Sequence, residues 1–427
     1  MAVSSPGADS APAVVRPERS LALLSVAHAF NHAQAALLPL VYLAIIPQFG
    51  ITVTAIAYLT AVGSFLSGAM QLSYSALTRR LSRRAILGWG NVVFGVFMAL
   101  QALASTFPPF ALANIISRVG GSPQHPVGNG LLAEQFPVHR RGFAISTHIA
   151  GGNVGTVAVP LAGAWLIAGV GWGWTVVLFG IPPIVIGIVM LGVLREHGTD
   201  QAAAIAHGSL RDAFRSVAHD RDLVLVFLSS MLGGGARGLG VLNLFVPLYL
   251  SLVLGLDSET VALMLTFLLI GSVPGPIIGG WLSDRLGRKP LIVAVYVGGA
   301  AALVLFVAAG SDTLLLWISI GFLSIFNFVE SPQLQSLLAD ISRPAVRDAS
   351  FSVYFTLAFG SGAIWVAGYG YITGALGNAA GLPVVFAIMA LAYLAAALLV
   401  LPIHVEERTA EVRAEEEAAI GQTSLMG

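Results

Sequence analysis

Three ionisable side chains lie deep inside long apolar stretches of this 427-residue chain, namely Glu330, Arg118 and Arg237. A charge inside a bilayer is costly, so such residues usually face a polar cavity or one another. A guanidinium group can bind carboxylate or phosphate oxygens through two parallel hydrogen bonds. A buried carboxylate can gain or lose a proton according to its neighbours. Two interpretations are open: a site for anions and protons, or a fixed ion pair that only neutralises buried charge.

Histidines and amides accompany these charges in the first part of the chain. Histidine titrates close to neutral pH, so His32 is a candidate for proton transfer. His125 precedes Pro126, which removes a backbone hydrogen bond and bends a helix. A single histidine in an apolar helix is nevertheless more often a hydrogen-bonded packing residue. The remaining members of the expected substrate and proton pathway are His28, His148, Asn31, Asn153 and Gln124.

Twelve apolar segments must hold these residues in place. Hydrophobic residues make up 56% of the chain and charged residues 10%, against about 25% charged residues in soluble proteins. A helix of about 20 mainly apolar residues crosses a bilayer. The segments are 21–47, 53–77, 85–104, 108–134, 142–168, 173–194, 223–253, 259–282, 290–309, 313–339, 346–375 and 382–403. The sequence therefore predicts an all-α membrane protein with twelve transmembrane helices.

Positive charge lies on only one side of these segments. Of the 21 Lys and Arg residues, Arg118 and Arg237 lie deep inside segments, and the others lie at a segment end, in alternate loops and in the two tails. Loops that retain Lys and Arg stay in the cytoplasm during insertion. Both termini are therefore predicted to be cytoplasmic.

The segments form two related sets of six. A polar stretch at 195–222 is expected to be a cytoplasmic linker between bundles at 21–194 and 223–403. Residues 1–20 are expected to form a disordered cytoplasmic tail, and residues 404–427 an acidic one. Residues 49–86 align with 254–291 at an offset of 205. Parallel repeats of this kind occur in transporters, so two pseudo-symmetric six-helix bundles are predicted.

A loop motif follows the eighth segment. Residues 280–291 read GWLSDRLGRKPL, which resembles the loop motif of the major facilitator superfamily. The resemblance implies the major facilitator fold and a conformational switch built from Gly280, Asp284, Arg285, Gly287 and Arg288. In the first-half copy Arg79 replaces the Asp and Ser82 replaces a Gly, while Arg80 and Arg83 remain. The switch in that half is expected to use another carboxylate, such as Glu134.

The first five segments carry a closer resemblance. The stretches AHAFNHAQAALLPL at 27–40, SPQHPVGNG at 122–130 and RRGFAISTHIAGGNVGTVAVPLAG at 140–163 are similar to the fosmidomycin-resistance branch of that superfamily. The resemblance implies proton-driven efflux of a drug or toxic metabolite, and hence antibiotic resistance. His32 replaces an Asp of that branch and Val127 replaces a Glu. The branch's proton chemistry therefore does not transfer to these two positions.

These observations together predict a secondary active transporter that works by alternating access. The expected reaction is proton-coupled antiport that exports a small anionic compound. Proton-coupled uptake of an organic anion by symport remains open, as does a membrane sensor that transports nothing. The expected partners are the substrate, protons and the bilayer, and no nucleic acid is expected to bind. The protein is expected to be a monomer in the bacterial cytoplasmic (inner) membrane. No enzyme motif is found, the chain has no cysteine, and neither a metal nor a cofactor is predicted.

Overall fold

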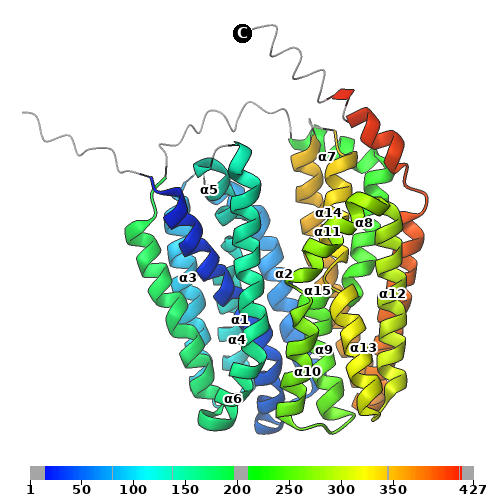
Figure 1. The fold of residues 1–427 in the computed structure, drawn as a ribbon. Coiled ribbons are helices and arrows are strands. Elements are labelled where there is room, and N and C mark those ends of the chain that lie inside the picture. Colours follow the sequence, from blue (N-terminus) through cyan, green and yellow to red (C-terminus); the bar gives the residue numbers. More distant parts are fainter. Residues whose placement is uncertain are drawn as a thin grey trace, which may run out of the picture.

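The computed structural model describes residues 15–78, 80–136, 138–196, 210–343, 346–412 and 414–415. Every regular element within these ranges is a helix (Figure 1). The first half contains α1 (Pro17–Phe49), α2 (Val53–Leu77), α3 (Arg83–Leu100), η1 (Gln101–Leu103), α4 (Phe107–Gly121), η2 (Ser122–Gln124), α5 (Pro126–Gln135) and α6 (Val138–Val193). Helix α7 (Leu210–His219) follows. The second half contains α8 (Arg221–Gly233), η4 (Gly234–Ala236), η5 (Gly238–Leu242), α9 (Asn243–Leu252), α10 (Ser258–Ile270), α11 (Pro274–Leu286), α12 (Arg288–Ala309), α13 (Thr313–Phe326), α14 (Glu330–Ile341) and α15 (Arg347–Val400).

Two of these helices are hairpins. The 56 residues of α6 would extend about 84 Å at 1.5 Å per residue, far beyond one bilayer crossing. Its backbone turns at Gly171, where φ is 81° and ψ is 161°. The backbone of α15 turns at Gly377, with φ 73° and ψ 164°. Glycine adopts positive φ without the steric cost that a Cβ imposes, so each turn depends on its glycine.

The number of membrane crossings follows from these hairpins. Among the described residues, 9 helices are long and apolar enough to cross a membrane. Two of them, Thr147–Val193 and Val353–Val400, contain the hairpins and so supply two crossings each. The pair α4 and α5 forms a further segment, interrupted at η2. Counting both arms of each hairpin and this interrupted segment gives twelve candidate crossings among the described residues.

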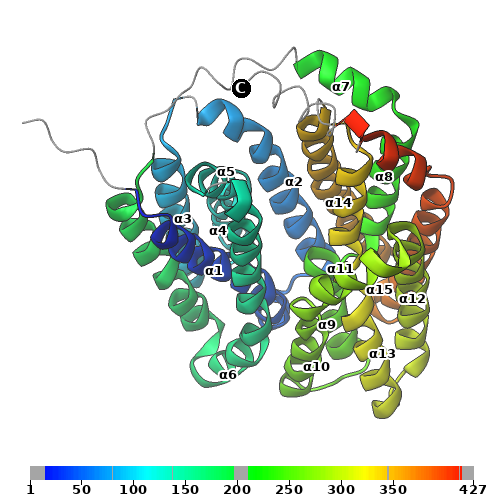
Figure 2. The same ribbon diagram turned by 45° about the horizontal axis from the view of Figure 1, so that its top comes forward.

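The helices gather into two groups, α1–α6 and α8–α15 (Figures 1 and 2). The start of α1 and helix α7 lie at the same end of the molecule (Figure 1). Near the other end Thr54 of α2 donates its hydroxyl hydrogen to the backbone oxygen of Gly370 in α15, at 2.8 Å. A Cβ on Gly370 would collide with Ala57, so the small residue permits this close approach. The two groups are therefore joined tightly at the end away from α7.

Several membrane helices are interrupted along their length. The interruptions are η2 between α4 and α5, η4 and η5 between α8 and α9, residues 271–273 between α10 and α11, and residues 327–329 between α13 and α14. Irregular backbone inside a membrane is tolerated where protein buries it or where it lines a cavity. His125, Arg237 and Glu330 each lie at one of these breaks. The fold thus brings the predicted polar residues to places where the backbone leaves the helix.

Candidate functional site

A cavity of about 320 Å³ lies between the two groups of helices. The predicted site residues in its wall are Asn31, His32, Arg118, His125 and Arg237. They come from α1, from α4 and its break, and from the break between α8 and α9. Both arginines therefore reach one cavity.

Glu330 lies directly behind Arg237 and forms a two-pronged ion pair with it. Arg237 donates from Nε to Oε2 of Glu330 at 2.9 Å and from Nη2 to Oε1 at 2.8 Å. The Glu330 side chain is 0% exposed, whereas the Arg237 side chain keeps 19% of its surface exposed. The carboxylate is thus sealed away, and only its partner touches the cavity.

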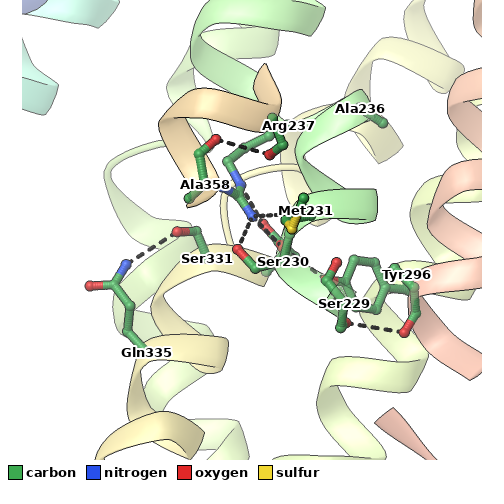
Figure 3. A network of polar contacts seen from close by, with 12 residues as sticks. Ser229, Ser230, Met231, Ala236, Arg237, Tyr296, Ser331, Gln335 and Ala358 are labelled. Atoms are coloured by element: carbon green, nitrogen blue, oxygen red, sulfur yellow. Dashed lines mark hydrogen bonds and ion pairs between the residues drawn. The ribbon is translucent and has the colours of Figure 1, made fainter. Parts of the chain in front are cut away.

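Further hydrogen bonds complete this pair. The Tyr296 hydroxyl donates to Oε1 of Glu330 at 2.9 Å. Nη2 of Arg237 donates to the backbone oxygen and to the hydroxyl of Ser230, each at 3.1 Å (Figure 3). A buried ion pair persists only when such additional bonds compensate the loss of water. We call Glu330, Arg237, Tyr296 and Ser230 the ion-pair network.

The local backbone explains the position of both ions. Helix α8 ends at Gly233, and Arg237 has an extended backbone between η4 and η5, with φ −66° and ψ 141°. Glu330 is the first residue of α14, where free backbone N–H groups and the helix dipole favour negative charge. A Cβ on Gly233 would lie 2.9 Å from Oε1 of Glu330, so this glycine leaves room for the carboxylate.

Arg118 is held by neutral groups. Its Nε donates to Oδ1 of Asn114 at 3.1 Å, and its Nη2 donates to the Tyr42 hydroxyl at 3.3 Å. Among the side chains that the structure describes, no carboxylate forms an ion pair with it. A Cβ on Gly63 would lie 2.6 Å from Cδ of Arg118, so α2 leaves space for the side chain. Arg118 therefore presents a positive charge to the cavity that an anionic ligand can neutralise.

The four predicted histidines form one cluster beside the cavity. Between ring centres, His28 lies 4.4 Å from His32, 4.6 Å from His125 and 4.4 Å from His148. His32 and His125 line the cavity, whereas His28 and His148 are fully buried behind them. We call these four residues the histidine cluster. It belongs entirely to the first half.

The predicted amides have different positions. Asn31 donates to the backbone oxygen of Gly121 at 2.9 Å and so ties α1 to α4 at the cavity wall. Gln124 is 1% exposed, and neither of its amide atoms has a hydrogen-bond partner in the described part of the chain. Asn153 is not in the cavity wall and donates instead to the backbone oxygen of Ser272 at 3.0 Å. Its contact joins α6 to the break after α10, so Asn153 links the two halves.

The loop motif forms a turn with an ion pair. Gly287, with φ 90°, separates α11 from α12. Arg288 donates from Nε to Oδ2 of Asp340 at 3.0 Å and from Nη1 to the Ser283 hydroxyl at 2.7 Å. Asp340 lies near the end of α14 and is not part of the motif. The side chain of Asp284 lies outside the described residues, so its predicted role stays a prediction.

The other motif residues have simpler surroundings. The guanidinium carbon of Arg285 lies 3.8 Å from the ring centre of Trp281, one turn earlier in α11. Among the described residues, leaving aside the backbone of its own helix, no atom lies within 4 Å of the position that a Cβ on Gly280 would occupy. Close helix packing therefore does not explain this glycine.

A carboxylate caps a helix next to the first-half copy of the motif. The backbone N–H groups of Arg83 and Arg84 donate to the Glu196 carboxylate at 3.1 Å and 2.8 Å. Glu196, which lies just after the end of α6, thus caps the start of α3. Arg80 is exposed in the turn that follows α2. The side chain of Glu134 lies outside the described residues, so its expected pairing also stays a prediction.

Comparison with known proteins identifies the family. A family model described as Major Facilitator Superfamily matches residues 24–367 and 227–425. The chain belongs to the Major Facilitator Superfamily. The expectation of a multi-pass membrane transporter, and not an enzyme, is thereby confirmed.

Individual relatives agree with this assignment. The fosmidomycin resistance protein of Escherichia coli is 26% identical over 82% of this chain and 86% of that protein. The probable L-galactonate transporter of Escherichia coli is 25% identical over 72% of each chain. A putative metabolite transport protein of Haemophilus influenzae is 27% identical over 58% of this chain, which spans 62% of that protein, less than two thirds of its length. The solved structure of a D-xylose-proton symporter shares the fold, with a TM-score of 0.74 at 16% identity over 91% of this chain and 98% of that one.

Sequence reasoning missed several neighbours of the site. Asn114 precedes Arg118 by four residues on α4, a spacing that places both on one helix face, so this contact could have been predicted. Tyr42 contacts Arg118, and Tyr296 contacts Glu330, each from another helix. No local sequence pattern marks either tyrosine. Asp340 lies near the end of α14, outside the loop motif, so the motif does not mark it.

Proposed function

We propose that this protein is a proton-coupled carrier of small organic anions that works by alternating access. The observation that carries the proposal is that the two arginines in one cavity have different side-chain partners. Arg118 contacts only neutral groups among the described side chains, whereas Arg237 is paired with the buried Glu330. One arginine is available to an anion at all times, and the other becomes available only when Glu330 is neutralised.

Protonation of Glu330 links binding of the proton to binding of the anion. While Glu330 is ionised, both of its oxygens engage Arg237. A proton on Glu330 removes this attraction, and the guanidinium of Arg237, which reaches the cavity, then binds a second oxygen of the anion. A proton and an anion therefore favour each other's binding. This chemistry supports symport, in which both move in the same direction.

Export by antiport, the reaction expected from the sequence, has separate support. A relative similar over most of this chain is named a fosmidomycin resistance protein. Uptake has comparable support from the probable L-galactonate transporter. Direction in such a carrier is set by coupling and gradients, so only a measurement of proton movement separates the two reactions.

The orientation that we propose places α7 and both termini in the cytoplasm of a bacterial cell, at the inner membrane. The basic loops lie at the α7 end, which supports this orientation. With the halves joined at the far end through Thr54 and Gly370, the cavity faces the cytoplasm. Arg288 and Asp340 both belong to the second half, so their ion pair is retained when the halves rock, and the conformational switch predicted at the motif loop stays a prediction. The division of the chain at 195–222 and the monomeric state remain predictions, and residues 197–209 lie outside the described ranges.

Proteoliposomes test the coupling directly. The purified protein is reconstituted with a pH-sensitive dye inside and the membrane potential clamped, and fosmidomycin or L-galactonate is added outside. Symport acidifies the interior as the anion enters, and antiport makes it alkaline. Glu330→Gln should abolish the pH change, while Glu406→Gln, at an exposed carboxylate after α15, should leave it unchanged. A wild-type pH response in Glu330→Gln would remove Glu330 from the mechanism.

A further inference from the structure

The histidine cluster contains a group of nitrogens that the proposed transport reaction does not use. Side-chain nitrogens of His28, His32 and His125 all lie within 4.8 Å of one another. His28 and His32 are four residues apart, so they share one face of α1, and His125 comes from the break between α4 and α5. Two histidines at this helical spacing with a third from another element form a common arrangement of metal ligands.

The hydrogen bonds of His28 leave one nitrogen available. Its Nδ1 lies 3.0 Å from the backbone oxygen of His148, which can only accept, so Nδ1 carries the hydrogen. In a neutral imidazole Nε2 then holds a lone pair. Within the described structure Nε2 has no hydrogen-bond partner, and His28 is 0% exposed. A metal-binding histidine has this pattern, with one nitrogen bonded to a backbone oxygen and the other bound to the ion.

His32 and His125 open the cluster to the cavity. Nδ1 of His32 lies 3.3 Å from the Thr156 hydroxyl, an outer partner of the kind that orients a metal-binding imidazole. For the His125 ring, no hydrogen bond occurs to any described residue. Both rings lie in the cavity wall, so an ion can enter from there.

We propose that His28, His32 and His125 together bind one divalent transition-metal ion of the zinc class, whose fourth coordination position faces the cavity. Imidazole ligands suit zinc, copper and nickel. Zinc–nitrogen bonds of about 2.0–2.1 Å in tetrahedral geometry place the ligand nitrogens about 3.4 Å apart. Side-chain rotations that move each ring nitrogen by about 1 Å bring the three histidines to this spacing. His148, stacked on His28 at 4.4 Å and 27°, is a positioning residue. A water molecule or an oxygen of an anionic ligand completes the coordination.

Metal binding at this site can be tested separately from the proposed transport. All three ligands belong to the first half, so binding requires no movement of one half against the other. A failure to bind metal would leave the proton and anion proposal standing, and a failure of proton coupling would leave the metal site standing. The sequence prediction of no metal site depended on the missing cysteines, and it overlooked the spacing of His28 and His32.

Spectroscopy with Co²⁺ tests the site without any substitution. The full-length protein is purified through a tag that lacks histidine, treated with a chelator and titrated with Co²⁺. The proposal predicts saturation at one equivalent, with the intense visible absorption of four-coordinate Co²⁺, and displacement by Zn²⁺. Only the weak absorption of six-coordinate hydrated Co²⁺, or no saturation at one equivalent, would overturn it.

Variants locate the ion. His32→Gln and His125→Gln should each weaken Zn²⁺ binding at least about 100-fold in competition with a coloured chelator, beyond the 10–100-fold loss typical of an outer partner. Thr156→Val should weaken it about 10-fold. His219→Gln, at an exposed histidine of α7, should not change it. Unchanged affinity in His32→Gln and His125→Gln would assign the ion to another site and refute the proposal, and size-exclusion profiles like the wild type's establish that the variants are folded.

Discussion

The two halves bury polar clusters at corresponding positions but satisfy them in opposite ways. An offset of 205 residues places His125 on Glu330 and His32 on Arg237. In the ion-pair network, hydrogen bonds from Arg237 and Tyr296 reach both oxygens of Glu330. In the histidine cluster, Nε2 of His28 and both ring nitrogens of His148 have no partner among the described groups.

This difference indicates that the two related sites have different functions, one in coupling and the other in ligand binding. A charged pair that is fully hydrogen-bonded is costly to break unless a proton or a ligand replaces a partner, so it suits coupling. Neutral imidazoles with spare lone pairs cost less to bury and are free to bind a ligand. The same place in each repeat thus carries different chemistry, and the following predictions test this contrast.

The largest effect is expected from breaking the ion pair on one side only. Arg237→Ala leaves Glu330 as a buried, unpaired charge, which should lower the free energy of unfolding by about 3–5 kcal/mol. The double variant Arg237→Ala with Glu330→Gln removes the uncompensated charge and should recover most of this loss. Chemical unfolding in detergent measures both. Equal losses in the single and double variants would mean that the pair is not a buried unit.

Tyr296→Phe removes one hydrogen bond to the same carboxylate. A hydrogen bond to a charged group contributes about 1.5–3 kcal/mol, so the unfolding free energy should fall by about that amount. Tyr249→Phe is a matched control, because Tyr249 is also buried and its hydroxyl makes no hydrogen bond with any described residue. Similar losses in the two variants would show that removal of a buried hydroxyl, and not loss of the bond to Glu330, destabilises the Tyr296 variant.

Arg118→Gln tests the cation that stands apart from both clusters. Loss of a charged hydrogen bond should weaken binding of an anionic probe about 10–100-fold, as measured by calorimetry. Stability should change by less than about 0.5 kcal/mol, since no described carboxylate is left unpaired. Arg118→Lys should recover only part of the affinity, because an ammonium group lacks the planar fork. Full binding by Arg118→Gln would exclude Arg118 from the anion site.

The smallest effect is expected in the histidine cluster. His148→Leu replaces two buried nitrogens that form no hydrogen bond of standard geometry in the described structure, although backbone groups of Gln124 and Leu24 lie beside the ring, so the unfolding free energy should change by less than about 1 kcal/mol or rise slightly. The melting temperature of the metal-free protein measures this. A loss of more than about 2 kcal/mol, the size expected for a buried polar contact, would show that these nitrogens are bonded after all.

Much of the fold follows from the sequence because bilayer thickness fixes the length of each apolar segment. The segment predicted at 173–194 corresponds to the second arm of α6, which ends at Val193. The basic loops likewise identify one end of the molecule without reference to side-chain packing. The interruptions were harder to predict: η2 has Pro123 and Pro126 nearby, whereas the break at 327–329 has no proline within it.

The site is only partly readable from sequence. Glu330, Arg118 and Arg237 stand out because charge is rare in apolar segments. Their pairing could not be predicted, because both arginines lie at similar depth and only tertiary packing places Arg237, not Arg118, against Glu330. Asn153 shows the converse: an amide in an apolar helix is as suitable for joining two halves as for lining a cavity.

The claim that Arg118 binds the anion while Glu330 carries the proton is tested most directly by counterflow. Proteoliposomes loaded with unlabelled anion exchange it for labelled anion at equal pH on both sides, a reaction that needs no net proton movement. Glu330→Gln should exchange at a rate close to the wild type's while moving no protons, and Arg118→Gln should lose exchange. Proton movement by Glu330→Gln, or wild-type exchange by Arg118→Gln, would contradict the account.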